Sequence, residues 1–450
     1  MMRMQLSQAA AVLGGEQHGD DVVLCGVSTD TRTVGPGELF VALRGPNFDA
    51  HDFLDAARAR GAAAALVERM PAPLPAIKVA DARVALGRLA AHWRARHRVD
   101  TVAVTGSNGK TTVKEMIAAI LARDAPVLAT RGNLNNDIGV PLTLACLDDG
   151  HRRLVVEMGA NHAGEIAALA AMASPRIGVI TLVAPAHLEG FGSIEGVARA
   201  KGELISALPA DGVAVVNADG GYQELWRELA AGRRLLRFGF HADADVRVQH
   251  EATHEGSRIT LHMPAGTLAA RLRLAGRHNA VNAAAAAAAA LAAGVPAQCI
   301  QAGLEAVRPV HGRLEILAAH GEVRVIDDTY NANPVSLRAA LEVLARFPPP
   351  RWLVLGDMGE LGADAEAFHR EAGRIARELG VECLLATGTL ARLAAQSFGA
   401  GARHFESRAL LARALIDELA GGSTVLVKGS RTMAMERVVA ALLQGDAQCC

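Results

Sequence analysis

The residues with the clearest chemical meaning lie between positions 102 and 121, in the run VAVTGSNGKTTVKEMIAAIL. A short apolar segment ends at Thr105, a glycine-containing turn follows, and a helix is expected from Lys110. The backbone N–H groups of such a turn converge beside the positive end of the helix dipole, where an anion is favoured. We therefore predict a nucleotide phosphate site. Its expected residues are Gly106, Asn108, Gly109, Lys110, Thr111 and Thr112.

Two side chains extend this prediction to the metal that accompanies a nucleotide. The Lys110 amine is placed to pair with the outer phosphates, and the Thr111 hydroxyl has the position of a ligand to nucleotide-bound Mg²⁺. The loop is shorter than a strict Walker A motif, which would have glycine where Val104 stands. The alternative is an ordinary glycine turn before a helix.

Further polar residues follow other apolar segments. Glu157 ends the segment RLVVE and can hold a metal ion, although a cluster that caps the next helix is the alternative. His187 follows the segment RIGVITLV, and Lys201 lies on the helix after it. A histidine and a lysine beside a phosphate loop can serve a magnesium nucleotide, whereas a lone histidine is more often structural.

Lysine is scarce in this chain. Only five of the 46 basic residues are lysine, at positions 78, 110, 114, 201 and 428. Arginine offers a planar fork and does not deprotonate, so a retained lysine can indicate a need for an amine or a compact charge. This reasoning favours Lys110, Lys201 and Lys428, with chance placement on solvated faces as the alternative.

These residues need elements to position them, and three regions alternate in strand and helix patterns. The expected modules are 1–98, a compact α/β module; 99–308, an ATPase-like domain with a mainly parallel sheet; and 309–450, a Rossmann-like domain. In the first module a helical pattern covers residues 51–68. The fold class is therefore α/β.

Composition excludes several functional classes. With 450 residues, 51% apolar, the chain can bury more than one core. A net charge of −1 and an aromatic content of 3% disfavour nucleic-acid binding. The cysteines have no CxxC spacing, so reduced thiols in the cytoplasm are expected. The alanine run 283–290 is too short to span a membrane.

The motifs, in their order along the chain, resemble the Mur ligases. They are VSTDTRTVGPGELFVALRGPNFDAHDF, TGSNGKTT, NLNNDIGVPLTL, EMGANHAGEI, AHLEGFGS with AKGE, HNAVNA, GRLE, DDTYNANPVS, GDMGELG and KGSR. The resemblance covers nearly the whole chain. The segments EMGANH and YNANP favour a dipeptide-adding member over a sibling that adds the third amino acid.

The resemblance implies an ATP-dependent ligase of peptidoglycan precursor synthesis. The implied substrates are UDP-N-acetylmuramoyl-tripeptide and D-alanyl-D-alanine, joined through an acyl phosphate by a cytoplasmic monomer. A GTPase is excluded by the absence of an Asn-Lys dipeptide. A folate-polyglutamate-type ligase is the closer rival, but it is not expected to carry this amino-terminal module. An interaction protein with a degenerate phosphate loop would be expected to lose its ionisable site residues. This chain has all of them, namely Lys110, Thr111, Glu157, His187 and Lys201.

The resemblance also implies roles for individual residues. Two Mg²⁺ ions would be held by Thr111, Glu157, His187 and a carbamylated Lys201, which with Lys110 are the implied catalytic residues. Asn282, Arg313 and Asp328 would contact the adenine, the phosphates and the ribose of ATP. The implied substrate-binding residues are Ser28, Asp30, Arg32, Asn47 and His51 for the uridine diphosphate end, then Asn135 and Asn136, and Asn331, Asn333, Lys428 and Arg431 for the dipeptide. A turn rich in Asn and Pro is the alternative for the YNANP segment.

Overall fold

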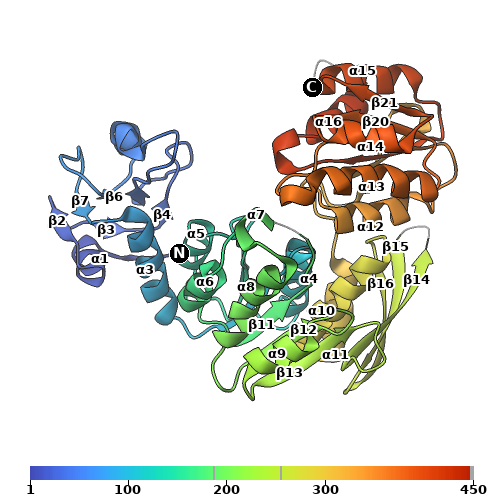
Figure 1. Cartoon of the computed structure of the whole chain (residues 1–450). Helices are drawn as coiled ribbons and strands as arrows, with labels where there is room; N and C mark the ends of the chain where they lie inside the picture. Colours follow the sequence, from blue (N-terminus) through green and yellow to red (C-terminus); the bar gives the residue numbers. More distant parts are fainter. Residues whose placement is uncertain (186–187, 254–255, 446–450) are drawn as a thin grey trace.

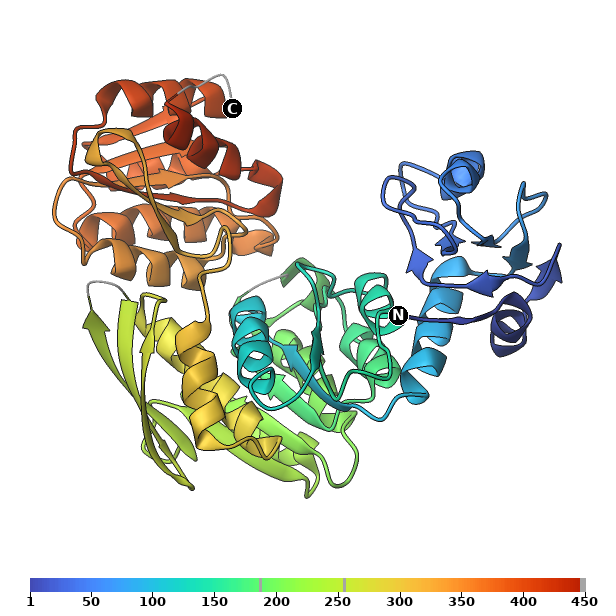
Figure 2. The ribbon, with the colours of Figure 1, turned by 180° about the vertical axis from the view of Figure 1, so that it is seen from behind.

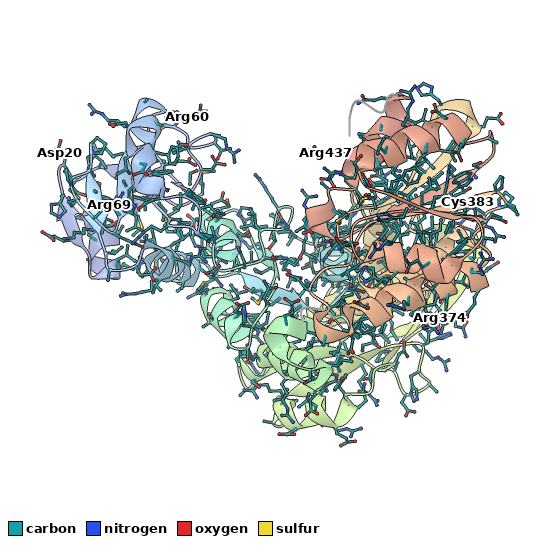
Figure 3. All side chains as sticks on the ribbon, turned by 45° about the horizontal axis from the view of Figure 1, so that its top comes forward. Asp20, Arg60, Arg69, Arg374, Cys383 and Arg437 are labelled. Atoms are coloured by element: carbon teal, nitrogen blue, oxygen red, sulfur yellow. The ribbon has the colours of Figure 1, made fainter. Side chains whose placement is uncertain are left out.

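The described residues form three α/β modules that follow one another along the chain (Figure 1). The structure is a computed structural model and describes residues 1–185, 188–253 and 256–445. The amino-terminal and carboxyl-terminal modules lie at opposite ends of the central one, and the reverse view shows the same arrangement (Figure 2). In Figure 3 the labelled Asp20, Arg60 and Arg69 lie on the first module, and Arg374, Cys383 and Arg437 on the last.

The amino-terminal module is built on a sheet of order β2-β7-β6-β5-β4, and β1 pairs separately with β3. Its elements are β1 (Met4–Gln5), α1 (Leu6–Leu13), β2 (Glu16–His18), β3 (Val23–Leu24), β4 (Val27–Ser28), β5 (Leu39–Val41), η1 (Ala50–Phe53), α2 (Leu54–Ala59), β6 (Ala64–Val67), β7 (Ala76–Lys78) and α3 (Ala82–Ala95).

The helix predicted over residues 51–68 is wrong in its second half. Helix α2 ends at Ala59, and Gly61 has a φ of +94°, which a residue with a side chain rarely adopts. The run Ala64–Val67 is a fully buried strand between β5 and β7. Pairing and burial in the sheet therefore override the helical preference of alanine.

The first module is attached to the central one through a shared core. On α3, Leu86, Leu89 and Trp93 belong to the same buried cluster as Leu144 and Leu169 of the central module. The Trp93 indole N–H also donates to the Leu147 carbonyl at 3.0 Å. The expected boundary at residue 98 falls between α3 and the first central strand.

The central module has a long sheet of order β16-β15-β14-β13-β12-β11-β8-β10-β9. Its elements are β8 (Asp100–Thr105), α4 (Lys110–Leu121), β9 (Val127–Ala129), α5 (Gly139–Ala145), β10 (Arg153–Glu157), α6 (Glu165–Ala173), β11 (Ile177–Ile180), α7 (Leu188–Phe191), α8 (Ile194–Ser206), β12 (Val213–Asn217), α9 (Gln223–Ala230), β13 (Arg234–Gly239), β14 (Val246–Thr253), β15 (Gly256–Met263), β16 (Gly266–Leu272), α10 (Arg277–Ala292) and α11 (Ala297–Ala306).

The central sheet is parallel from β9 to β14, which confirms the predicted mainly parallel sheet. Strands β15 and β16 add antiparallel pairs at one edge, which the sequence analysis did not foresee. The alanine run 283–290 lies in α10 and is buried throughout. Its small side chains belong to the same core as Val113, Met116 and Ile117 of α4, so α10 helps to fix the helix of the phosphate loop. No helix in the described part of the chain is long and apolar enough to cross a membrane.

The carboxyl-terminal module has a sheet of order β17-β18-β22-β19-β20-β21, parallel except for β17. Helices α12, α13 and α14 contribute to the core on one face, and α15 and α16 to the core on the other, as in a Rossmann-like fold. Its elements are β17 (Glu315–Ala318), η2 (His320–Glu322), β18 (Arg324–Asp328), α12 (Pro334–Leu344), β19 (Arg351–Leu355), η3 (Gly362–Asp364), α13 (Ala365–Glu378), β20 (Cys383–Thr387), α14 (Ala391–Phe398), β21 (Ala402–Phe405), α15 (Arg408–Glu418), β22 (Thr424–Lys428), η4 (Arg431–Met433) and α16 (Glu436–Gln444). The predicted α/β class is confirmed.

Candidate active site

The predicted phosphate loop joins the end of β8 at Thr105 to the start of α4 at Lys110. The loop is held against the end of β11, because the Thr181 hydroxyl donates to the Asn108 carbonyl at 2.6 Å. The Ser107 hydroxyl donates to the Ala184 carbonyl at 3.0 Å. The free N–H groups at the start of α4 therefore lie in a fixed position beside the helix dipole, as an anion site requires.

Two glycines make this geometry possible. Gly106 and Gly109 have φ values of +141° and +81°. A Cβ at Gly106 would stand 2.0 Å from the Thr181 hydroxyl oxygen, and one at Gly109 would stand 2.6 Å from the Asn282 amide oxygen. Both positions therefore favour glycine for conformation, and Gly106 also for space, because the backbone of Leu182 stands 3.1 Å from the same Cβ position.

Lys110 folds back over its own loop. Its Nζ donates to the Gly106 carbonyl at 2.7 Å. Burial lowers the pKa of the Lys110 amine; the Glu157 carboxylate opposes this shift, and the positive charge of Arg313 adds to it. The Lys110 amine thus lies at the phosphate loop, where both Glu157 and Arg313 are near enough to affect its pKa.

Glu157 ends β10 and is 1% exposed. One carboxylate oxygen accepts from the Thr111 hydroxyl at 2.9 Å, and the other accepts from the Asn135 amide at 2.7 Å. The Thr111 oxygen in turn accepts from the Arg313 guanidinium at 2.8 Å. Within the described residues Glu157 forms no ion pair, so its buried charge is compensated only by hydrogen bonds and by the more distant lysine.

This donor set fits a magnesium ion. A carboxylate and a hydroxyl are hard oxygen ligands of the kind that Mg²⁺ takes beside a nucleotide phosphate. Burying an unpaired carboxylate is costly, and a bound cation would remove that cost. Arg313 occupies one acceptor position of the Thr111 oxygen, so an ion bound there would compete with the guanidinium for this atom.

The helix-capping alternative applies to the residues after Glu157. The Asn161 N–H and the His162 ring lie 2.8 and 3.1 Å from the Glu165 carboxylate, at the start of α6. Glu157 itself takes no part in that cap and faces Thr111. Glu157 at the end of β10 therefore faces the phosphate loop, whereas Glu165 at the start of α6 belongs to the helix cap.

Lys201 lies on α8 with its amine buried at 2% exposure. The amine donates to the Ala160 carbonyl at 3.2 Å and stands 4.9 Å from the ring centre of Phe191. Burial, with a smaller effect from the positive charge of Lys110, lowers the pKa of this amine to about 7. A substantial fraction of Lys201 is therefore neutral, and nucleophilic, near neutral pH.

Two adjoining cavities meet at the phosphate loop. One, of about 240 Å³, lies between the central and carboxyl-terminal modules and is lined by Asn282, Arg313 and Asp328. The other, of about 300 Å³, contains Lys110, Glu157, Asn135 and Asn136. Asn108, Gly109, Arg313, Tyr330 and Asn331 line both. The expected nucleotide residues Asn282, Arg313 and Asp328 therefore lie in a cavity adjoining the one that contains the expected metal ligand Glu157. Thr111 and Lys201 line neither cavity.

The carboxyl-terminal module contacts the loop directly. The side-chain amides of Asn108 and Asn333 donate to each other, at 3.2 and 2.7 Å. Asn333 also caps α12, accepting from the Ser336 N–H at 2.9 Å. With the Thr111–Arg313 bond, these contacts hold the two modules together in this structure.

Lys428 ends β22 and is buried. It forms an ion pair with the Asp328 carboxylate and donates to the Asn331 carbonyl at 2.9 Å. The amine thus joins two neighbouring strand ends of the carboxyl-terminal sheet. Arg431 lies further along on η4, is exposed, and approaches Glu436 at 3.4 Å.

Comparison with models of known protein families finds matches to three successive parts of the chain. Residues 24–94 match the description "Mur ligase family, catalytic domain", 104–290 "Mur ligase middle domain", and 312–431 "Mur ligase, glutamate ligase domain". These matches cover most of the chain. The chain belongs to the Mur ligase family.

Individual relatives are similar over nearly their full length. The UDP-N-acetylmuramoyl-tripeptide–D-alanyl-D-alanine ligase of Escherichia coli strain K12 is 45% identical over 446 residues, which cover 98% of this chain and 99% of the relative. A crystal structure of MurF from Acinetobacter baumannii has a TM-score of 0.92 at 36% identity and covers 99% of each chain. MurF ligase from Thermotoga maritima, in complex with ADP, has a TM-score of 0.83 at 29% identity, covering 93% of this chain and 97% of that one.

The amino-terminal residues of this Mur ligase form local networks. Asp30 accepts from the Arg32 backbone N–H at 2.8 Å and pairs with its guanidinium at 2.7 Å. The buried His51 has both ring nitrogens engaged: Nδ1 with Asp49 at 2.6 Å and Nε2 with the Glu68 N–H at 2.9 Å. Ser28 is buried, and Asn47 is exposed. The uridine diphosphate role of these residues remains a prediction.

Some residues lining the first cavity were not singled out from the sequence. Thr181 anchors the loop from the end of an apolar strand, where nothing marked it as functional. His278 belongs to the HNAVNA motif, whose asparagines alone were considered; burial lowers the pKa of its ring to about 4, so the ring is neutral at pH 7. Tyr330, which the sequence pattern did include in the YNANP segment, has its ring centre 4.0 Å from the Arg313 guanidinium. His187 lies outside the described residues.

Proposed function

We propose that this chain joins D-alanyl-D-alanine to UDP-N-acetylmuramoyl-tripeptide with ATP, in peptidoglycan precursor synthesis. The observation that carries the chemistry is the pair of adjoining cavities at the phosphate loop, with Lys110 and Glu157 in one and Asn282 in the other. The Thr111 hydroxyl is hydrogen-bonded to Glu157 beside them. The substrates are those in the name of the Escherichia coli relative, which is similar over nearly the whole chain.

The proposed reaction has two steps. The γ-phosphoryl group of ATP passes to the terminal carboxylate of the tripeptide, which forms an acyl phosphate and releases ADP. The amine of the dipeptide then attacks the acyl carbon, a C–N bond forms, and phosphate leaves while the amine proton passes to solvent. Lys110 would draw negative charge off the transferred group, and the loop N–H groups would orient it.

Thr111, Glu157, His187 and Lys201 are the proposed magnesium ligands, for two ions. When bound, magnesium would reduce the repulsion between the carboxylate and the γ-phosphate. Lys201 would serve after carbamylation, because its neutral amine can react with carbon dioxide and the product is an anionic ligand. Arginine at this position would remain a cation.

The proposed contacts with ATP and the substrates are based on where these residues lie in the sequence motifs and in the two cavities. Asn282, Arg313 and Asp328 would contact adenine, phosphates and ribose across the first cavity. Asn135 faces Glu157 in the second cavity, whereas Asn136 caps α5 by accepting from the Gly139 N–H at 2.9 Å. The remaining proposed substrate residues are Ser28, Asp30, Arg32, Asn47 and His51 for the uridine diphosphate end, and Asn331, Asn333, Lys428 and Arg431 for the dipeptide. The proposed working form is a cytoplasmic monomer.

The test is phosphate release from ATP by the purified chain. We expect release only when both UDP-N-acetylmuramoyl-tripeptide and D-alanyl-D-alanine are present. A single amino acid in place of the dipeptide should give little release. Release that depends on a single amino acid, or on a folate acceptor, would retain the ligase chemistry and refute the named substrates.

A further inference from the structure

A histidine and two carboxylates converge at the start of the carboxyl-terminal module. His311 lies in the linker between α11 and β17, and Glu315 and Asp327 are directly opposed residues of the antiparallel pair β17–β18. The His311 Nδ1 atom is 3.2 Å from the Glu315 Oε2 atom and 3.7 Å from the Asp327 Oδ2 atom. All three potential ligand atoms lie within 4.8 Å of one another.

The Asp327 side chain is fully buried, yet half of its carboxylate is left without a hydrogen bond. Its Oδ1 atom accepts from the Thr329 hydroxyl and backbone N–H at 2.6 and 3.1 Å. Its Oδ2 atom is buried and has no hydrogen-bond partner, and the His311 ring is beyond hydrogen-bond distance. A buried carboxylate oxygen without a partner is costly, which indicates that a cation belongs beside it.

The spacing suits a small divalent ion. Zinc binds histidine nitrogen and carboxylate oxygen at about 2.0–2.2 Å, so ligand atoms on a tetrahedral ion are roughly 3.3 Å apart. The His311 Nδ1 atom is 3.2 Å from the Glu315 oxygen and 3.7 Å from the Asp327 oxygen, and these distances lie on either side of this value. The His311 side chain is 79% exposed and that of Glu315 27%, so solvent can supply a remaining ligand.

We propose that His311, Glu315 and Asp327 bind a divalent transition metal ion such as Zn²⁺, at a site separate from the magnesium site. An imidazole together with two carboxylates binds zinc-like ions more tightly than Mg²⁺, whose ligands are mostly oxygen atoms. Such an ion would tie the linker to the first strand pair of the carboxyl-terminal module, two residues before Arg313. The site would therefore stabilise the connection from which Arg313 reaches the phosphate loop.

The experiment is a calorimetric titration of the full-length, nucleotide-free chain with Zn²⁺ after treatment with a chelator. We expect one tight site that excess Mg²⁺ does not displace. His311→Ala and Asp327→Asn should weaken it by more than the roughly 10–100-fold that loss of an outer-shell partner costs. His311 is exposed, so its replacement should leave the fold intact, and circular dichroism would verify this.

Two control variants locate the ion. His241→Ala removes an exposed histidine whose ring is 3.8 Å from Asp243, and it should bind Zn²⁺ like the parent chain. Glu157→Gln removes the oxygen site and should also leave tight Zn²⁺ binding unchanged. With Co²⁺ as the probe, the visible spectrum should report nitrogen and oxygen ligands without the intense bands of thiolate ligation.

Several results would overturn the proposal. Absence of tight Zn²⁺ binding by the parent chain would show that these three side chains do not form a metal site. Binding that survives in both His311→Ala and Asp327→Asn, or that is lost in Glu157→Gln, would place the ion elsewhere. Thiolate bands with Co²⁺ would assign it to cysteine.

Discussion

Lysine is rare in this Mur ligase, and the buried lysines have different partners. Lys114 donates to the Thr130 carbonyl at 2.8 Å and pairs with Glu115, so it has a structural role away from the cavities. Lys428 pairs with Asp328. Within the described residues Lys201 forms no ion pair, and its amine has a pKa of about 7. Scarcity favoured Lys201 and Lys428, which are buried, but it did not separate them from the equally buried Lys114; the contacts do.

Lys201→Ala should lower kcat for phosphate release by about 10²–10³-fold, the range seen when one electrostatic contact to a transition state is lost. Lys201→Arg should be equally impaired, because a guanidinium cannot become a carboxylate. Added acetate should restore part of the activity to Lys201→Ala but none to Lys201→Arg, whose longer side chain fills the site. Full activity of Lys201→Arg would contradict the carbamylation proposal.

At the level of single elements, several candidate residues, such as Glu157, Asp328 and Lys428, end strands, and buried contacts fix the turns that follow. In the carboxyl-terminal module, the turn after β19 is held by His369 of α13, which is fully buried. One ring nitrogen accepts from the Met358 N–H at 2.9 Å, and the other donates to the Ala365 carbonyl at 2.6 Å. Such a ring must be neutral, and burial lowers its pKa.

This histidine should make folding sensitive to acid. The folded-state pKa lies below the unfolded value of about 6.5, so below that pH the unfolded chain binds the proton first and stability falls. The loss should be at most about 1.4 kcal/mol per pH unit, and stability should be regained above pH 7. Urea unfolding between pH 7 and 5 should show a smaller pH dependence for His369→Gln than for the parent. An unchanged pH dependence would show that this ring is not the titrating group.

At the scale of the whole molecule, the site is assembled from two modules. The phosphate loop, Glu157 and Lys201 come from the central module, whereas Arg313 and Asp328 come from the carboxyl-terminal one. In this structure Arg313 bonds to the Thr111 hydroxyl, the atom expected to meet magnesium. Nucleotide binding should therefore exchange a contact between modules for contacts to phosphate and metal.

Arg313→Ala should loosen the unliganded molecule and weaken ATP binding. We expect faster hydrogen exchange in the linker and in the 106–109 loop, and an increase of about tenfold in the KM for ATP from loss of one charge-assisted bond. Arg374→Ala, which removes a surface pair with Glu371, is the matched control and should change neither. Unchanged exchange in Arg313→Ala would show that other contacts hold the modules together.

The α/β class and the family resemblance follow from the amino-acid sequence alone, because apolar strand runs and a Gly-Lys-Thr turn are local patterns. The sequence also singled out Glu157 and Lys201 as candidates, because a carboxylate at a strand end and a rare lysine on a nearby helix are visible in the order of residues alone; their roles stay predictions. It did not determine the strand Ala64–Val67, since alanine favours a helix until a sheet buries it on both sides. Nor did it indicate the antiparallel edge strands β15 and β16.

Which residues contact one another depends on how the chain packs in three dimensions. The bonds from Thr111 to Glu157 and Arg313, and from Asn108 to Asn333, join positions far apart in the sequence. The lowered pKa of Lys201 also depends on packing, because it arises from burial against α7 and from the positive charge of Lys110 on another helix. Local sequence patterns fix whether a segment is a helix or a strand. The distances between side chains, their burial and the electrostatic effect of one residue on another arise only when the modules pack.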